Sequence, residues 1–268
     1  MEIPFSKWYG ALARRRSRRL FDSKPVDPDL LARLNTVCEE FRPFTEARAV
    51  IVTRSPGRVF KGAFGHYGKI KGASAFIAFI GNTDDPNIQE KVGYLGEGTV
   101  LEATTLDLGT CWVGGFFRPD VAASLAIIKK NEKVFAVTPV GYVMEKWSLE
   151  EKIMTGFGLT HKRKPLSELV TGLDNLKWPL WIKTALEAAR VAPSAVNRQP
   201  WRFQVEPYSI TISVDDLKDT YNIPKRLDCG IAMLHIEVAS LYCGVRGKWE
   251  FLEPPKVACF KAVNFNIE

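Results

Sequence analysis

The spacing of apolar residues predicts helices near the start of the chain. Residues 27–41 repeat leucine, valine and cysteine at helical intervals, and either Asp27 or Asp29 can cap the helix. Residues 11–19 are rich in alanine, leucine and arginine, which favour helix, so a first helix is predicted there.

Two runs of β-branched and aromatic residues, 47–53 and 74–81, predict strands with a glycine-rich loop between them. The pattern then continues into a long helix that is apolar on nearly every side and must be covered all round. Glycines within this helix indicate close packing against a neighbour. The predicted elements are the long helix at 89–109, a short helix at 120–133, a buried strand at 134–143 and a polar connector at 155–175.

The pattern restarts after the connector. The predicted elements are a helix at 179–192, hairpin strands at 201–206 and 210–215, a buried helix at 230–244 and a strand at 256–263. "EATTLDLG" (Glu102 to Gly109) aligns with "EVASLYCG" (Glu237 to Gly244), which indicates two tandem copies of one unit. Helices and strands do not alternate strictly, so we expect an α+β fold with antiparallel or mixed sheets. The two halves are residues 1–170 and 171–268, forming one compact unit.

Composition favours a globular, soluble protein. Hydrophobic residues make up 46% and charged residues 25% of the 268 positions, and the apolar runs are too short to span a bilayer. The five cysteines are odd in number and scattered, and the three histidines lack ligand spacing. We therefore expect neither disulfides nor a metal site. The N-terminus lacks the apolar core of a secretory signal, so a cytoplasmic location is expected.

Positive charge gathers in "RRRSRR" (Arg14 to Arg19) and "HKRK" (His161 to Lys164), within a net charge of +7. Such clusters suit either a nucleic acid or an anionic phosphate. Nucleic-acid readers usually interleave charge with exposed aromatics or a recognition helix, and neither pattern is present. We expect a small-molecule partner and neither a nucleic acid nor a membrane.

The stretch "ARVAPSAVNRQPWRF" (Ala189 to Phe203) joins a predicted helix to a predicted strand. A simple turn needs one or two punctuating residues. This one holds Pro193, Ser194, Asn197, Gln199 and Pro200 within eight positions. So many hydrogen-bonding side chains indicate that the turn faces a ligand.

Four motifs together resemble the nitroreductase superfamily of FMN enzymes. "RRSRRLF" (Arg15 to Phe21) fits its R-R-S-x-R-x-F opening, and "APSAVNRQPWRF" fits its A-P-S-x-x-N-x-Q-P-W-x-F segment. "LDLGTCWVGGF" (Leu106 to Phe116) resembles the loop after its central helix, and "KRKPLSELV" (Lys162 to Val170) its basic ending. The motifs occur in the expected order over nearly the whole chain.

The resemblance implies a fused arrangement. Usual members are homodimers whose FMN is contacted by both subunits, whereas here the motifs are divided between the halves. The first half has the Arg-Arg-Ser opening, the Gly-Gly loop and the basic ending, and the second half has the Pro-Ser turn. The chain therefore resembles the single-chain, tandem-fused nitroreductases. One FMN per chain is expected, in a monomeric pseudo-dimer or a weak homo-oligomer.

The resemblance also implies a role for each matched residue. Arg15, Ser17 and Arg163 would bind the FMN phosphate, with Arg16 and Lys162 near the phosphate or ribityl chain, because guanidinium groups bind phosphate in bidentate fashion. Arg19 would lie beside flavin N1, and Val113, Gly114 and Gly115 would direct loop N–H groups towards N5. Pro193 and Ser194 would lie along the ring and ribityl chain, and the amides of Asn197 and Gln199 at the pyrimidine edge.

The implied activity is a ping-pong reaction in which NAD(P)H reduces the flavin, and a nitroaromatic, quinone or similar acceptor is then reduced. No side chain is assigned a catalytic role, because the flavin carries the chemistry. The alternatives left open are a reductive dehalogenase or flavin-fragmenting member, and a non-catalytic flavin-binding or sensing protein. The glycine-rich loop from Gly62 to Gly72, with His66, Tyr67, Lys69 and Lys71, is a candidate lid over the flavin face.

Overall fold

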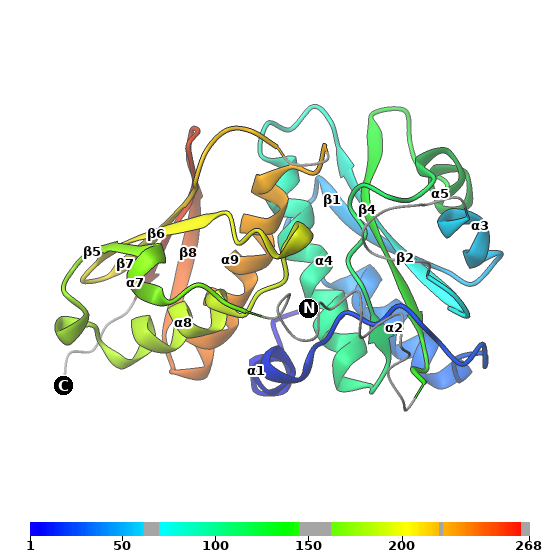
Figure 1. The fold of residues 1–268 in the computed structure, drawn as a ribbon, viewed down its shortest axis with the longest axis horizontal. Coiled ribbons are helices and arrows are strands. Elements are labelled where there is room, and N and C mark those ends of the chain that lie inside the picture. Colours follow the sequence, from blue (N-terminus) through cyan, green and yellow to red (C-terminus); the bar gives the residue numbers. More distant parts are fainter. Residues whose placement is uncertain (62–69, 145–161, 220–221, 264–268) are drawn as a thin grey trace.

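Two β-sheets flank a central pair of long helices. The computed structural model describes residues 1–61, 70–144, 162–219 and 222–263. At its centre lie α4 (Ile88–Thr105) and α9 (Lys225–Tyr242), with one sheet on each side (Figure 1). Both helices are buried along most of their length, as their apolar patterns predict. The mixed α+β architecture with mainly antiparallel sheets is confirmed.

The first sheet has the strand order β1-β2-β4-β3, and its strands pair antiparallel. Helices α3 and α5 cover its outer face, where their apolar side chains form a second core cluster with the sheet. The elements of this part are α1 (Phe5–Arg14), α2 (Pro28–Glu40), β1 (Ala47–Val52), α3 (Pro56–Phe60), β2 (Ala75–Asn82), β3 (Gly109–Thr110), α5 (Pro119–Ala126) and β4 (Glu132–Gly141).

The second sheet has the order β5-β6-β7-β9-β8, in which β5 pairs parallel to β6 and the other pairs are antiparallel. Its elements are α7 (Leu166–Leu169), β5 (Val170–Gly172), the 3₁₀ turn Asn175–Lys177, α8 (Leu180–Arg190), the 3₁₀ turn Ala195–Asn197, β6 (Trp201–Glu206), β7 (Ser209–Val214), β8 (Arg246–Phe251) and β9 (Lys256–Val263). The predicted hairpin is confirmed as β6 and β7.

The two central helices approach each other at glycines. A Cβ atom on Gly93 would lie 2.1 Å from the carbonyl oxygen of Leu227, and one on Gly230 would lie 2.0 Å from that of Glu90. Real Cβ atoms do not come so close, so these positions need glycine. The close packing that the helix glycines predict is confirmed.

Three sequence predictions are corrected. The predicted helix at 11–19 is shifted, since α1 ends at Arg14 and the chain then pairs with neighbouring backbone, which overrides a weak helix propensity. The connector at 155–175 contains α7 and β5, elements too short to leave a pattern. Strand β8 was also missed, because it is an edge strand whose outward residues are charged and whose inward residues are only half-buried.

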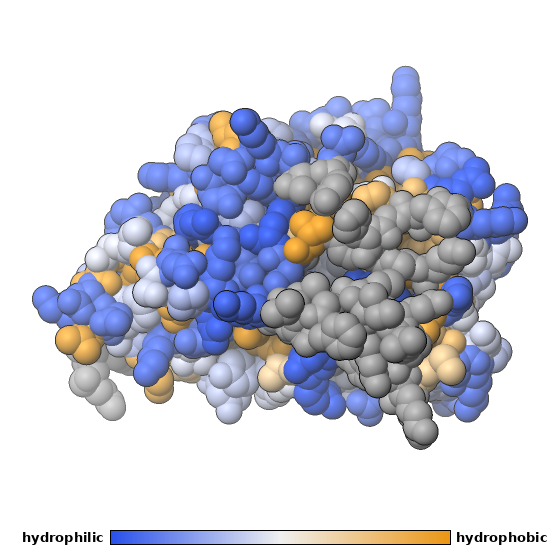
Figure 2. All heavy atoms as spheres, in the orientation of Figure 1, coloured by the Kyte–Doolittle hydropathy of each residue, from blue (hydrophilic) through white to orange (hydrophobic). Residues whose placement is uncertain are grey.

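The surface is mostly hydrophilic, as expected when the apolar residues are buried in the core. On the face drawn in Figure 2, hydrophilic side chains cover most of the coloured area and hydrophobic ones occur in small groups. In the described parts of the chain, no helix combines the length and the hydropathy needed to cross a bilayer.

Candidate functional site

A cavity lies beside the first turns of α9. Four segments meet there, namely the chain after α1, the loop after β3, the turn after α8 and the start of α9. The lining includes the predicted residues Ser17, Arg19, Val113, Gly114, Gly115, Pro193 and Ser194. Phe60, Ile70, Phe116, Ile223, Leu227 and Ile231 give the rest of the wall an apolar character.

Ser17 and Arg19 reach the cavity because the chain leaves the helix after Arg14 and runs extended beside β3. Ser17 forms a parallel bridge with Thr110, and the Arg18 N–H donates to the Thr110 carbonyl at 2.8 Å. In extended chain, alternate residues point the same way, so Ser17 and Arg19 share a side.

A cluster of guanidinium groups adjoins this segment. The Arg15 side chain is only 7% exposed, and its Nε has no hydrogen-bond partner among the described residues. Burial lowers the pKa of Arg15, and burial together with Arg15, Arg16 and Arg190 lowers the pKa of Arg163 to about 10. Buried like charges with an unpaired donor form an environment that an anionic group would stabilise.

Glu97 of α4 links this cluster to the cavity wall. Its Oε2 accepts a hydrogen bond from Nε1 of the cavity residue Trp112 at 2.7 Å, and its Oε1 lies 3.9 Å from Arg15 Nε. The same Oε1 lies 3.0 Å from Nε2 of His235, whose Nδ1 lies 2.8 Å from the Ala188 carbonyl. Glu97 and His235 are both fully buried.

The loop after β3 brings backbone to the cavity. Val113 forms two backbone hydrogen bonds with Val137, at 2.9 and 3.0 Å, which fix the loop on β4. Gly114 faces Ile223, since a Cβ atom there would lie 3.0 Å from Ile223 Cγ2. Cys111 also lines the cavity as a free thiol.

The amides of Asn197 and Gln199 bind the segment that carries the second basic cluster. Oε1 of Gln199 accepts from the Lys164 N–H at 2.8 Å. Both amides donate to the Lys162 carbonyl, at 2.9 and 3.1 Å, and Arg163 donates to Oδ1 of Asn197. Neither residue lines the cavity. Their assignment to the flavin edge stays a prediction, while their present contacts tie the turn to the guanidinium cluster.

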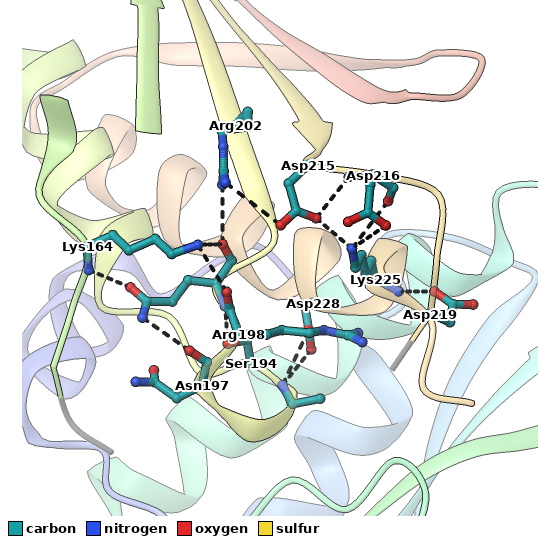
Figure 3. Close-up of polar contacts among 12 residues, drawn as sticks. Lys164, Ser194, Asn197, Arg198, Arg202, Asp215, Asp216, Asp219, Lys225 and Asp228 are labelled. Carbon is teal, nitrogen blue, oxygen red and sulfur yellow. Dashed lines mark hydrogen bonds and ion pairs between the residues drawn. The ribbon is translucent and has the colours of Figure 1, made fainter. Parts of the chain in front are cut away.

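An ionic network joins the other side of the turn to α9 (Figure 3). Arg198 pairs through Nε with Asp228 of α9 at 2.7 Å. Nearby, Lys225 Nζ lies 2.7 Å from Asp215, and the Asp215 N–H donates to the Pro200 carbonyl at 2.7 Å. Residues 197–200 of the turn are thus held on two sides, by the segment 162–164 and by the network at the start of α9.

Sequence reasoning missed Glu97, Arg190, Arg198, Asp228 and His235. For Glu97, Asp228 and His235 the only signal was a polar or charged residue inside a helix that is otherwise apolar all round. Arg190 lies at the end of α8 and Arg198 in the turn, where no such signal exists. His161, and the candidate lid residues His66, Tyr67 and Lys69, lie outside the described residues. Among the described residues, no group of histidine, cysteine, aspartate and glutamate is arranged to hold a metal ion.

Comparison with known proteins identifies the family. The family model described as "Putative TM nitroreductase" matches residues 7–240. The chain belongs to this nitroreductase family, and this membership supports a role as an oxidoreductase.

A solved structure from Thermotoga maritima shares the fold. A nitroreductase structure from Thermotoga maritima is 19% identical, with a TM-score of 0.66 over 95% of this chain and 93% of that one. A nitroreductase with bound FMN from Bacteroides fragilis is 16% identical, with a TM-score of 0.43 over 53% of this chain and 91% of that one. No curated protein matches this chain.

Proposed function

We propose that this chain is an FMN-dependent oxidoreductase, in which NAD(P)H reduces the flavin and a nitroaromatic, quinone or similar acceptor is reduced in turn. The observation that carries the proposal is the buried Arg15 guanidinium beside Arg163 and a largely apolar cavity, since its Nε has no hydrogen-bond partner among the described residues. FMN has two matching parts, an anionic phosphate and a flat ring.

The residues present fit this cofactor. Arg15 and Arg163, with Ser17, Arg16 and Lys162, would hold the phosphate, since the cluster carries more positive than negative charge and Arg15 lacks a full set of partners. Bound FMN would supply the two-electron chemistry, and the side chains need only bind, orient and exclude water.

The cavity wall fits the ring. Arg19 would lie beside the N1 edge, and the loop at Gly114 and Gly115 would approach N5 through backbone N–H groups. Pro193 and Ser194 would lie against the ring and ribityl chain.

We further propose that residues 1–170 and 171–268 act as the two halves of a pseudo-dimer, with one flavin per chain. The division of the proposed contacts supports this, because the phosphate clamp lies in the first half and the Pro-Ser turn in the second. A partner subunit is then not needed to complete the site.

The visible absorption spectrum tests the proposal. Purified protein should bind about one FMN per chain and turn yellow, and NADH or NADPH should bleach the band under anaerobic conditions. A quinone or nitroaromatic should restore it. Bound flavin that neither nucleotide reduces would favour the sensing protein, and protein that binds no added FMN would contradict the proposal.

A further inference from the structure

Asp228 contacts Ala195 and Arg198, on either side of Val196 and Asn197, in the turn from Pro193 to Gln199, hereafter the 193–199 turn. Its carboxylate oxygens lie 3.1 and 3.3 Å from the Ala195 nitrogen, and its Oδ2 lies 2.7 Å from Nε of Arg198 (Figure 3). Asp228 itself lines the cavity and is 1% exposed.

The 193–199 turn needs such support because its backbone is strained. Val196, Asn197 and Gln199 have φ angles of +50°, +56° and +50°, the left-handed region. A β-branched residue such as Val196 is a true outlier there, and each such residue costs roughly 1–2 kcal/mol. Residues held in this way cluster at ligand sites, where surrounding contacts keep them in place.

The Asp228–Arg198 pair is poorly explained by stability alone. Burial raises the pKa of Asp228 to about 6, against the opposing effects of Arg198 and the Ala195 N–H. Arg198 is 9% exposed, and neither Nη1 nor Nη2 has a hydrogen-bond partner among the described residues. Buried ion pairs are often no more stabilising than apolar residues of the same size. The pair therefore suits a positioning role.

We propose that Asp228 is a positioning residue for the cofactor: its ionised carboxylate holds Ala195 and Arg198, and so fixes the 193–199 turn against the cavity. This inference rests on the proposed function, because the turn supplies Pro193 and Ser194 to the flavin side of the cavity.

The proposal makes flavin affinity depend on the charge of Asp228. The charged and titratable groups that act on this carboxylate are Arg198 of the turn and Asp219 before α9. Its neighbour Cys229 on α9 is a buried thiol whose own pKa is raised by burial and then by Asp228. Protonation removes the negative partner of Arg198 and loosens the turn. By linkage, flavin binding must favour the ionised form in equal measure.

The experiment measures the dissociation constants of FMN and riboflavin by flavin fluorescence between pH 5 and pH 8. Riboflavin is included because it lacks the phosphate, whose second ionisation falls near pH 6. For the wild-type protein, affinity for riboflavin should fall about tenfold from pH 7.5 to pH 5 as Asp228 takes up its proton, and affinity for FMN should fall by at least as much.

Asp228→Asn is the test variant, since it keeps an acceptor for the Ala195 N–H and loses the charge. It should bind both flavins about tenfold more weakly at pH 7.5, and riboflavin affinity should no longer change with pH. Asp216→Asn is the matched control, because Asp216 is 59% exposed and pairs with Lys225 in the same network. It should keep the wild-type profile.

Arg198→Met gives an independent test should Asp228→Asn fold poorly. Loss of the arginine removes an interaction that lowers the Asp228 pKa, so any remaining pH step should move to higher pH. Wild-type affinity and an unchanged pH step in both variants would overturn the inference while leaving the proposed function intact. Failure of the wild-type protein to bind either flavin would overturn both.

Discussion

Nε2 of His235 lies 3.0 Å from Oε1 of Glu97, and both side chains are fully buried where α9 packs against α4. Nδ1 of His235 lies 2.8 Å from the Ala188 carbonyl oxygen and donates to it, because a carbonyl oxygen can only accept. Trp112 donates to the other carboxylate oxygen. One acidic side chain therefore connects both central helices to the cavity wall.

Replacement of Glu97 should strongly destabilise the fold. In Glu97→Ala, the indole of Trp112 and the ring of His235 lose their buried hydrogen-bond partner, so the free energy of unfolding should fall by about 3–5 kcal/mol. Urea denaturation followed by circular dichroism measures this. Glu250→Ala removes an ion pair with Lys261 in which both side chains are more than half exposed, and it should change stability little. Equal losses in the two variants would contradict the prediction.

Mutations in both halves should weaken FMN binding. Arg15→Ala removes a buried cation from the proposed phosphate clamp, and Asn197→Ala removes the contacts between the turn and Lys162 and Arg163. Each should raise the FMN dissociation constant at least tenfold, because the loss of one charge-assisted hydrogen bond lowers the binding free energy by about 1.5 kcal/mol or more. Riboflavin separates the two effects, since Arg15→Ala should leave its affinity nearly unchanged. If only one variant binds FMN more weakly, the shared site is wrong.

Alanine at the helix crossing should be poorly tolerated. Gly93→Ala and Gly230→Ala each bring a methyl group against backbone carbonyl oxygen at 2.1 and 2.0 Å, so the helices must separate. We expect a loss of roughly 1–3 kcal/mol or more in each case. Gly10→Ala in α1 is the control, because nothing lies within 4 Å of its Cβ position. That substitution should raise stability by about 0.5–1 kcal/mol, by thermal or urea unfolding.

Stability should vary with pH through Asp228. Burial raises its pKa from 3.8 to about 6, so the folded protein keeps a proton that the unfolded chain releases in this window. The free energy of unfolding should therefore fall as pH rises from about 4 to 6, with a slope of up to about 1.4 kcal/mol per pH unit. Asp228→Asn should lack this part of the slope. Parallel pH profiles of the two proteins would contradict the assignment.

Several elements could be predicted because their signals are local. Helix α2 begins at its aspartate cap, with the Asp27 side chain accepting from the Asp29 N–H. The two apolar-all-round helices are α4 and α9, and the predicted hairpin is β6 and β7. Strands β3, β5 and β8 escaped prediction, since two are two or three residues long and the third is a charged edge strand.

The candidate site also has features that the sequence predicts and features that only the fold creates. The sequence by itself determined which motifs make up the candidate site: a basic opening, a Gly-Gly loop and a turn crowded with polar side chains. Each motif consists of residues close together in the chain, so it can be recognised without the fold. Only the tertiary structure decided that Arg15 lies beside Glu97, that the amides of Asn197 and Gln199 bind residues 162–164, and that Asp228 holds the strained turn. These contacts join residues far apart in sequence, and burial, which sets the pKa values, exists only once the chain has packed.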